Sequence, residues 1–234
     1  KADLISASYL ISVLPDDSKL PIDTTSLYQV VDISLIELVP LPPAYTGCYH
    51  RNRIWVTRAQ GVSDDGQSAI YYSNTAGDAY SEQYNPLNAL RAERGDGIIA
   101  TKLISFEADL IQLKNSKTLI VKNGDPQNGI TILDYTIGTP NIRLAVYIPR
   151  LGIVAITNDQ SNFMILGYDL RWTKLIAGGY DIAKPIRFFT RTLIDNPQAT
   201  YFKYKNGKLF ITYGESSVIY ILHVEEARGW TRYI

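Results

Sequence analysis

The feature that most constrains this chain is a recurring unit in which a polar turn, an apolar strand, a second turn and a second apolar strand follow one another. The first strands are expected at residues 53–57, 117–121, 152–156 and 207–211, and their partners at 69–73, 130–135, 163–168 and 218–222. Self-similarity at a period of about 40 to 60 residues, with three or four strands per unit, is typical of β-propellers and related β-arrays. Strands that are apolar on both sides fit such an array, because neighbouring sheets cover both faces of each sheet.

Two copies of the unit end alike. Residues 168–173 (YDLRWT) and 225–231 (EEARGWT) both close on Trp-Thr, so that Trp172 and Trp230 are 58 residues apart. The glycines that open the corresponding strands, Gly152 and Gly207, are 55 residues apart. We therefore predict that both tryptophans are mostly buried, that they occupy equivalent places in successive units, and that each packs against the next sheet.

The composition supports a strand-rich fold. The chain has 17 Tyr and 3 Trp, residues that suit a pleated, half-buried surface, and its 46% hydrophobic content is enough for a core. We predict one all-β domain over residues 1–234, a β-propeller-like array of about four to five blades built from antiparallel sheets, with a β-sandwich as the alternative. Repeated blades would occupy residues 43–234, and strands within residues 1–42 could complete the ring. Residues 85–94 are expected to form a helical turn or a loop.

The charge balance and the cysteine count exclude several classes of protein. The 23 basic and 23 acidic residues give a net charge of zero, so no long-range attraction to nucleic acid or to an anionic membrane is expected. Cys48 is the single cysteine, which excludes an intrachain disulfide framework and a multi-cysteine metal site. The sequence contains no run of about 18 apolar residues, so no membrane-spanning helix is predicted.

Two short motifs resemble known sites but are predicted to be turns. Residues 95–100 (GDGIIA) match the dinucleotide fingerprint, yet that fingerprint must open a helix, and residues 101–106 have the pattern of a strand. Gly95, Asp96 and Gly97 are therefore predicted to form a structural turn between blades. Residues 63–67 (SDDGQ) resemble the Asp-box of sialidase-like propellers, but the glycine comes one residue early and no Trp follows, which favours a hairpin turn.

The candidates for catalysis and metal binding are few. Cys48 and His50 would share one face of a strand, but a nucleophile also needs an orienting third group, so Cys48 is predicted to be a buried small apolar residue. His50 and His223 are the two histidines, and they are not spaced as a metal-binding pair. Residues 123–129 (NGDPQNG) lack the acidic series of a calcium loop and are expected to form a β-turn. We therefore predict that the protein is not an enzyme and has no catalytic, cofactor-binding or metal-binding residues.

A succession of motifs from Pro43 onward is more informative than any of them alone. Residues 43–56 (PAYTGCYHRNRIWV), which include Trp55, are followed by 70–79 (IYYSNTAGDA), 94–99 (RGDGII), 103–106 (LISF), 110–114 (LIQLK) and 117–124 (KTLIVKNG). Near the end of the chain, 219–224 (IYILHV) and 229–233 (GWTRY) form a related close, with His223 in place of an Asp. This order resembles that of tailed-bacteriophage tail nozzle and tail-tube-end proteins, which are β-propeller-like structural proteins.

The resemblance implies a virion structural protein of a phage tail or portal-vertex complex, assembled in the host cytoplasm. Its partners would be portal, adaptor and tail proteins and further copies of itself in a ring around the DNA exit path. DNA would pass through without sequence-specific contact, and no membrane would be involved. Trp55, Trp172 and Trp230 would have structural roles. The alternative is a glycan-binding or glycan-cleaving propeller, which would gather acidic and exposed aromatic side chains at one mouth of the ring. The Trp-Asp and Gly-His signatures of cellular interaction propellers are missing.

Overall fold

The computed structural model describes residues 39–40, 44–59, 68–75, 83–84, 88–92, 98–157, 163–174, 176–177, 180–181, 200–213, 219–223 and 229–233. Within these residues the chain forms four antiparallel four-stranded sheets and two short two-stranded ladders. Three 3₁₀ turns accompany them: η3 (Lys122–Gly124), η4 (Pro126–Asn128) and η5 (Ile142–Leu144). No helix in this part of the chain has the length and apolar character needed to cross a membrane.

The four sheets follow one another in chain order. Sheet 1 contains β2 (Ala44–His50), β3 (Arg53–Ala59), β4 (Ile70–Tyr72) and β6 (Ala89–Leu90). Sheet 2 contains β7 (Ala100–Phe106), β8 (Asp109–Lys114), β9 (Thr118–Val121) and β10 (Thr131–Asp134). Sheet 3 contains β11 (Ala145–Ile148), β12 (Gly152–Ile156), β13 (Phe163–Leu166) and β14 (Trp172–Lys174). Sheet 4 contains β17 (Thr200–Lys205), β18 (Lys208–Tyr213), β19 (Ile219–His223) and β20 (Gly229–Tyr233).

The two ladders lie outside these sheets. β1 (Val39–Pro40) pairs with β5 (Gln83–Tyr84), and β15 (Ile176–Ala177) pairs with β16 (Tyr180–Asp181). The strands predicted within residues 1–38 lie outside the described residues.

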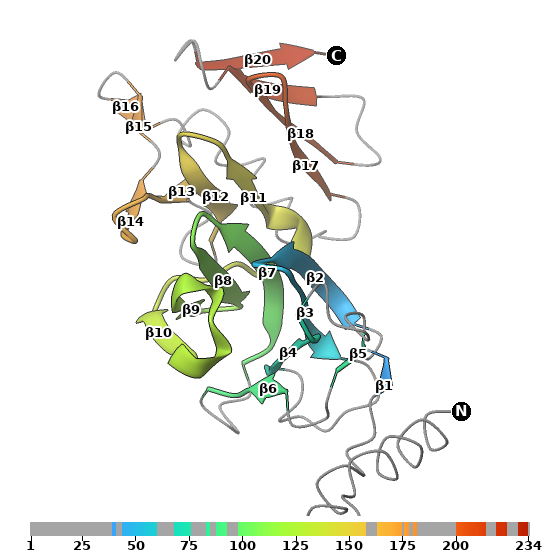
Figure 1. The fold of residues 1–234 in the computed structure, drawn as a ribbon. Coiled ribbons are helices and arrows are strands. Elements are labelled where there is room, and N and C mark those ends of the chain that lie inside the picture. The colour runs from blue at the N-terminus through green and yellow to red at the C-terminus, as the bar shows by residue number, and fades with distance from the viewer. Residues whose placement is uncertain are drawn as a thin grey trace, which may run out of the picture.

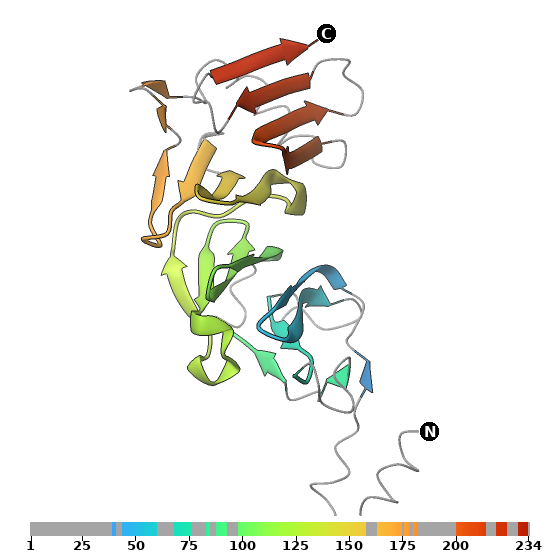
Figure 2. The same ribbon diagram turned by 45° about the horizontal axis from the view of Figure 1, so that its top comes forward.

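Each four-stranded sheet is a meander, and neighbouring sheets stack face to face along an arc (Figures 1 and 2). The first strands of consecutive sheets contact each other, β2 with β7, β7 with β11 and β11 with β17. Sheets 1 and 4 form the two ends of the arc. The prediction of an all-β, blade-like array of antiparallel sheets is therefore confirmed.

Tight turns join the first two strands of a sheet. In sheet 1 the loop residues Arg51 and Asn52 both have positive φ, 49° and 59°, and in sheet 4 Asn206 and Gly207 have 50° and 73°. Two-residue loops with positive φ at both positions match the right-handed twist of the strands they connect. These polar loops thereby set the register of the hairpins that the sequence predicts.

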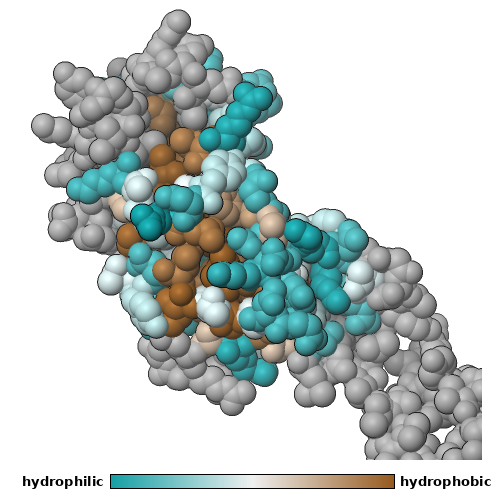
Figure 3. Space-filling model, turned by 60° about the vertical axis from the view of Figure 1, so that its left-hand side comes forward, coloured by the Kyte–Doolittle hydropathy of each residue, from teal (hydrophilic) through white to brown (hydrophobic). Residues whose placement is uncertain are grey.

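The hydrophobic core is divided among the junctions between sheets. The junction of sheets 1 and 2 buries Trp55, Ile70, Leu103, Leu110 and Val121. The junction of sheets 2 and 3 buries Ile104, Phe106, Ile111, Leu113, Ile120, Ala145, Ile153, Ala155 and Leu166. The junction of sheets 3 and 4 buries Leu144, Ile148, Val154, Ile156, Phe163, Ile165, Leu209, Ile211 and Leu222. In the view of Figure 3, apolar surface lies in the middle of the described part and hydrophilic surface borders it.

Two local predictions were wrong. Residues 117–121 were predicted to be equivalent to 152–156 and 207–211, which form β12 and β18, the second strands of sheets 3 and 4. They form β9 instead, the third strand of sheet 2, whose second strand is β8. The expected helical turn or loop at 85–94 contains strand β6, because Ala89 and Leu90 pair with β4 at the sheet edge. Residues 123–129, predicted as a β-turn, form parts of two 3₁₀ turns, which are closed by the same i to i+3 backbone hydrogen bonds as a β-turn.

Candidate functional site

The junction of sheets 1 and 2 holds a buried polar cluster around His50. His50 is 4% exposed, its Nδ1 lies 2.7 Å from the hydroxyl of Ser105, and its Nε2 lies 3.1 Å from the carbonyl oxygen of Ala108. A carbonyl can only accept, so Nε2 carries the proton and Nδ1 accepts from Ser105. Burial lowers the pKa of His50, which favours this neutral form.

Ser105 and His50 thus form a hydrogen-bonded serine–histidine pair. In a hydrolase such a pair activates the hydroxyl, but a carboxylate usually orients the imidazole and the hydroxyl faces the substrate. Here a backbone carbonyl orients the ring, and the backbone of Gly124 lies against it so closely that a Cβ at this position would meet the ring at 2.3 Å. The arrangement joins β2 to the β7–β8 turn across the junction.

Cys48 lies two residues before His50 on β2 and packs against the apolar core of the junction. The thiol is half-buried, and burial raises its pKa to about 12. The thiol therefore stays protonated at neutral pH, where a thiolate would be the reactive form.

Gln112 makes a second polar link between sheets 1 and 2. Its side chain is fully buried, and Nε2 donates to Thr57 Oγ1 at 2.8 Å and to the carbonyl of Ser68 at 2.9 Å. Thr57 in turn donates to the carbonyl of Ala69. Gln112 Oε1 has no hydrogen-bond partner within the described part of the chain. These bonds fix β8 against β3 and β4 in one register.

The junction of sheets 2 and 3 has its own polar contacts, one near the β7–β8 turn and one near the starts of β7 and β11. Tyr147 on β11 donates to Glu107 in the β7–β8 turn at 2.7 Å. The hydrogen bond with the Tyr168 hydroxyl and the bond to Glu107 raise the pKa of Tyr147. Lys102 on β7 donates to the carbonyl of Ala145 on β11. Burial lowers the pKa of Lys102 to about 8.

The sheets use equivalent positions to contact the preceding sheet. In sheet 3, Tyr147 lies opposite Ile153, and both pack against sheet 2. In sheet 4, Tyr204 lies opposite Leu209, and both pack against sheet 3. Each pair joins the next-to-last residue of the first strand to the second residue of the second strand. The register of the hairpin therefore determines which residues form the contact face.

The tryptophans predicted to be structural have different environments. Trp55 is fully buried and donates from Nε1 to the carbonyl of His50 at 2.9 Å. Trp172 is half-buried and donates to Thr118 Oγ1 at 3.0 Å, so it packs against the preceding sheet and not, as predicted, the next one. Gly95, Asp96 and Gly97 and the side chain of Trp230 lie outside the described residues.

The backbone places of Trp172 and Trp230 are equivalent, as predicted. Trp172 lies in the fourth strand of sheet 3 opposite Leu166, and Trp230 lies in the fourth strand of sheet 4 opposite Leu222. The matching ends of the two motifs in the sequence therefore report a true structural repeat.

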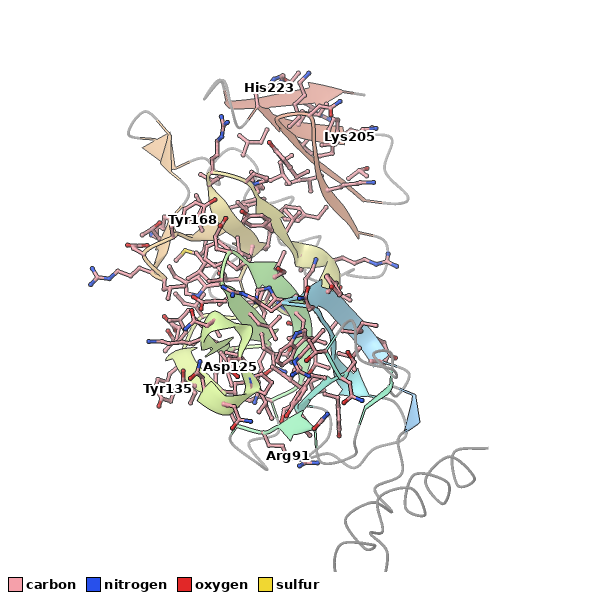
Figure 4. All side chains as sticks on the ribbon, in the orientation of Figure 1. Arg91, Asp125, Tyr135, Tyr168, Lys205 and His223 are labelled. Carbon is pink, nitrogen blue, oxygen red and sulfur yellow. The ribbon has the colours of Figure 1, made fainter. Side chains whose placement is uncertain are left out.

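A hollow beside η3 and η4 is lined by Lys122, Asn123, Asn128 and Thr131. Among the described residues that line it there is neither a carboxylate nor an aromatic ring, whereas a glycosidase site requires two carboxylates. The side chains of Asp125 and Asn128 make hydrogen bonds within the loop. Asp125 accepts from the backbone amide of Gln127, and Asn128 donates to the carbonyl of Lys122. Figure 4 shows Asp125 and Tyr135 in this region. No group of three or more His, Cys, Asp or Glu side chains in the described ranges could hold a metal ion.

Sequence reasoning missed Ser105 and Gln112 as cross-sheet partners. His50 and Ser105 are 55 residues apart, as are Thr57 and Gln112, so only the stacking of sheets brings them together. A buried Gln within an apolar strand was the one available signal. No known family model matches the chain, and comparison with curated proteins also finds no match.

Proposed function

We propose that this chain is a structural protein of a tailed-phage virion, in the tail or portal-vertex complex, and that it acts by protein–protein contacts around the DNA exit path. Its partners are portal, adaptor and tail proteins. The observation that carries the proposal is the ordered run of nozzle-like motifs between residues 43 and 124, together with the elements that these motifs form.

The motif run coincides with two neighbouring sheets. Residues 43–56 span β2, its turn and most of β3, and residues 70–72 form β4. Residues 103–106, 110–114 and 118–121 fall in β7, β8 and β9. The motifs therefore follow the strand order of two blade-like units, which is the arrangement expected if the resemblance reflects a common fold.

The chemistry of the junctions also supports a structural role. Three of the buried polar side chains, His50, Gln112 and Thr57, bond to groups of the neighbouring sheet or strand. Their hydrogen bonds join sheets, as expected of a protein whose task is to hold a rigid shape.

Mass spectrometry of gradient-purified virions of the virus that encodes this chain tests the proposal. We expect its peptides in the particles at a low, fixed ratio to the major capsid protein, and antibodies against it should label one vertex in electron micrographs. Antibodies against the capsid protein, labelling the whole shell, are the control. Absence of the chain from purified particles would refute the proposal.

A further inference from the structure

The outer face of sheet 1 exposes residues at register positions that, in sheets 3 and 4, pack against the preceding sheet. Tyr49 lies opposite Ile54, at the same register position as Tyr147 and Ile153 in sheet 3 and as Tyr204 and Leu209 in sheet 4. The pairs of sheets 3 and 4 pack against a preceding sheet, whereas Tyr49 is 61% exposed and Ile54 is 39% exposed.

The outer face of sheet 4 carries the complementary pattern. In sheets 2 and 3 the face toward the next sheet contains the cross-strand pairs Ile111–Ile120 and Val154–Ile165, all in the core. The corresponding pair in sheet 4 is Phe210–Ile221, and both residues are only half-buried.

Ile219 extends this outer face of sheet 4. It lies opposite Thr212. The corresponding pair in sheet 3 is Ile156–Phe163, and both of its residues are in the core between sheets 3 and 4. Phe163 is 1% exposed, but Ile219 is 38% exposed. Exposed apolar residues at positions that are otherwise buried mark an interaction surface.

We propose that the outer face of sheet 4 in one copy packs on the outer face of sheet 1 in the next copy, as sheet 3 packs on sheet 2 within the chain. The two faces lie at opposite ends of the arc, where Figure 4 places Lys205 and His223 far from Arg91. The contact is therefore head-to-tail, and it generates a closed ring if the rotation closes. This inference rests on the proposed structural role and adds the two surfaces through which copies of the chain meet.

Polar groups at the rim fit the same contact. Within the chain, Tyr147 donates to Glu107, the first residue of the preceding sheet's two-residue turn. In sheet 4 the corresponding turn position is Asn206. The Asn206 side chain would accept from the Tyr49 hydroxyl of the next copy, whereas in the single chain this hydroxyl donates to Asn52. Lys203 takes the register position of Ile104 and Val146 and is exposed in the single chain. In the proposed contact its methylene stem would cover apolar surface while its ammonium group stayed at the rim.

Light scattering coupled to size-exclusion chromatography of the purified chain tests this contact, with Ile54→Glu blocking one face and Ile219→Glu the other. The wild-type chain is expected to assemble in a concentration-dependent manner, and each variant is expected to be monomeric. An equimolar mixture of the two variants should form a one-to-one dimer, because each retains the face that the other lacks. Tyr135→Glu, at a tyrosine that is 66% exposed on β10's following turn, is the matched control and should assemble like the wild type.

A monomeric wild-type chain, a single variant that still assembles, or a mixture that stays monomeric while the wild type assembles would each overturn the proposal. Tyr49→Lys serves as a second sheet 1 variant if far-UV circular dichroism shows that Ile54→Glu is unfolded. The outcome is separate from that of the virion test. A chain that is present in virions but monomeric in solution would refute the head-to-tail contact alone. A chain that assembles but is absent from virions would refute the phage assignment alone.

Discussion

The junction of sheets 3 and 4 and the junction of sheets 1 and 2 are built differently. Between sheets 3 and 4 the hydrophobic core contains nine buried aliphatic and aromatic residues, and the ring centroids of Phe163 and Phe202 are 6.0 Å apart. Between sheets 1 and 2 the apolar core is smaller, and His50 and Gln112 are buried beside it. The same stacking of sheets is thus held by apolar area in one place and by specific hydrogen bonds in another.

The difference concerns specificity as much as stability. Apolar burial is non-directional and contributes in proportion to area, so several registers of two apolar faces would have similar energies. A buried amide or imidazole without its partner is costly, so Gln112 and His50 disfavour every arrangement except the observed one. We expect large losses of stability from truncations in the apolar junction and smaller but more position-dependent losses in the polar one.

The largest expected effect is that of Phe163→Ala at the junction of sheets 3 and 4. It should lower the free energy of unfolding by about 3 to 5 kcal/mol, since it removes a buried ring and leaves a cavity. Urea denaturation followed by tryptophan fluorescence measures this. Phe163→Leu should cost clearly less, and equal losses for the two variants would show that the ring does not fill the junction.

Gln112→Met is expected to cost about 1 to 3 kcal/mol at the junction of sheets 1 and 2, because the Ser68 carbonyl loses its donor in a buried site. The same denaturation experiment measures it. Gln127→Met, at an exposed glutamine on η4, is the control and should change stability little. A loss no larger than that of the control would mean that Gln112 does not fix the junction.

The pH dependence of stability sharpens the comparison further. An unfolded histidine has a pKa of about 6.5, and burial lowers the folded pKa of His50, so the unfolded chain binds more protons between the two values. The His50 contribution is therefore fully present above about pH 6.5 and is lost as the pH falls below it. Denaturation at pH 7.5 and 5.5 should show a steeper fall for the wild type than for His50→Gln. Parallel curves would argue against a buried neutral His50.

Cys48 should show the smallest effect on stability and a clear effect on reactivity. Its thiol has a pKa raised to about 12 by burial, so a thiol reagent at neutral pH should label the native chain far more slowly than the unfolded chain. Cys48→Ser should reduce stability only modestly. Rapid native labelling would indicate an exposed thiolate and would reopen a chemical role for this residue.

The sequence predicted the fold better than the site, for physical reasons. Runs such as 152–156 and 207–211 have strand character that persists wherever they pack, so β12 and β18 could be recognised locally. Strand β6 has two residues, too few for any period, and forms only because β4 offers a free edge. Hydrophobic patterning also identifies a strand without giving its order in the sheet, which is why β9 was mistaken for the equivalent of β12.

The cross-sheet contacts were beyond local reasoning. The pairing of His50 with Ser105 depends on how two sheets stack, and nothing in the residues around either one specifies the other. The equivalence of Trp172 and Trp230 was predictable because a repeat leaves matched spacings in the sequence itself.

A crystal structure of the chain would show whether consecutive four-stranded sheets repeat one register. We expect Trp172 and Trp230 in the fourth strands of successive sheets, opposite Leu166 and Leu222. The pairs Tyr49–Ile54, Tyr147–Ile153 and Tyr204–Leu209 should lie at matching positions. Tryptophans in non-equivalent strands, or a different cross-strand partner for any of these tyrosines, would contradict this repeat.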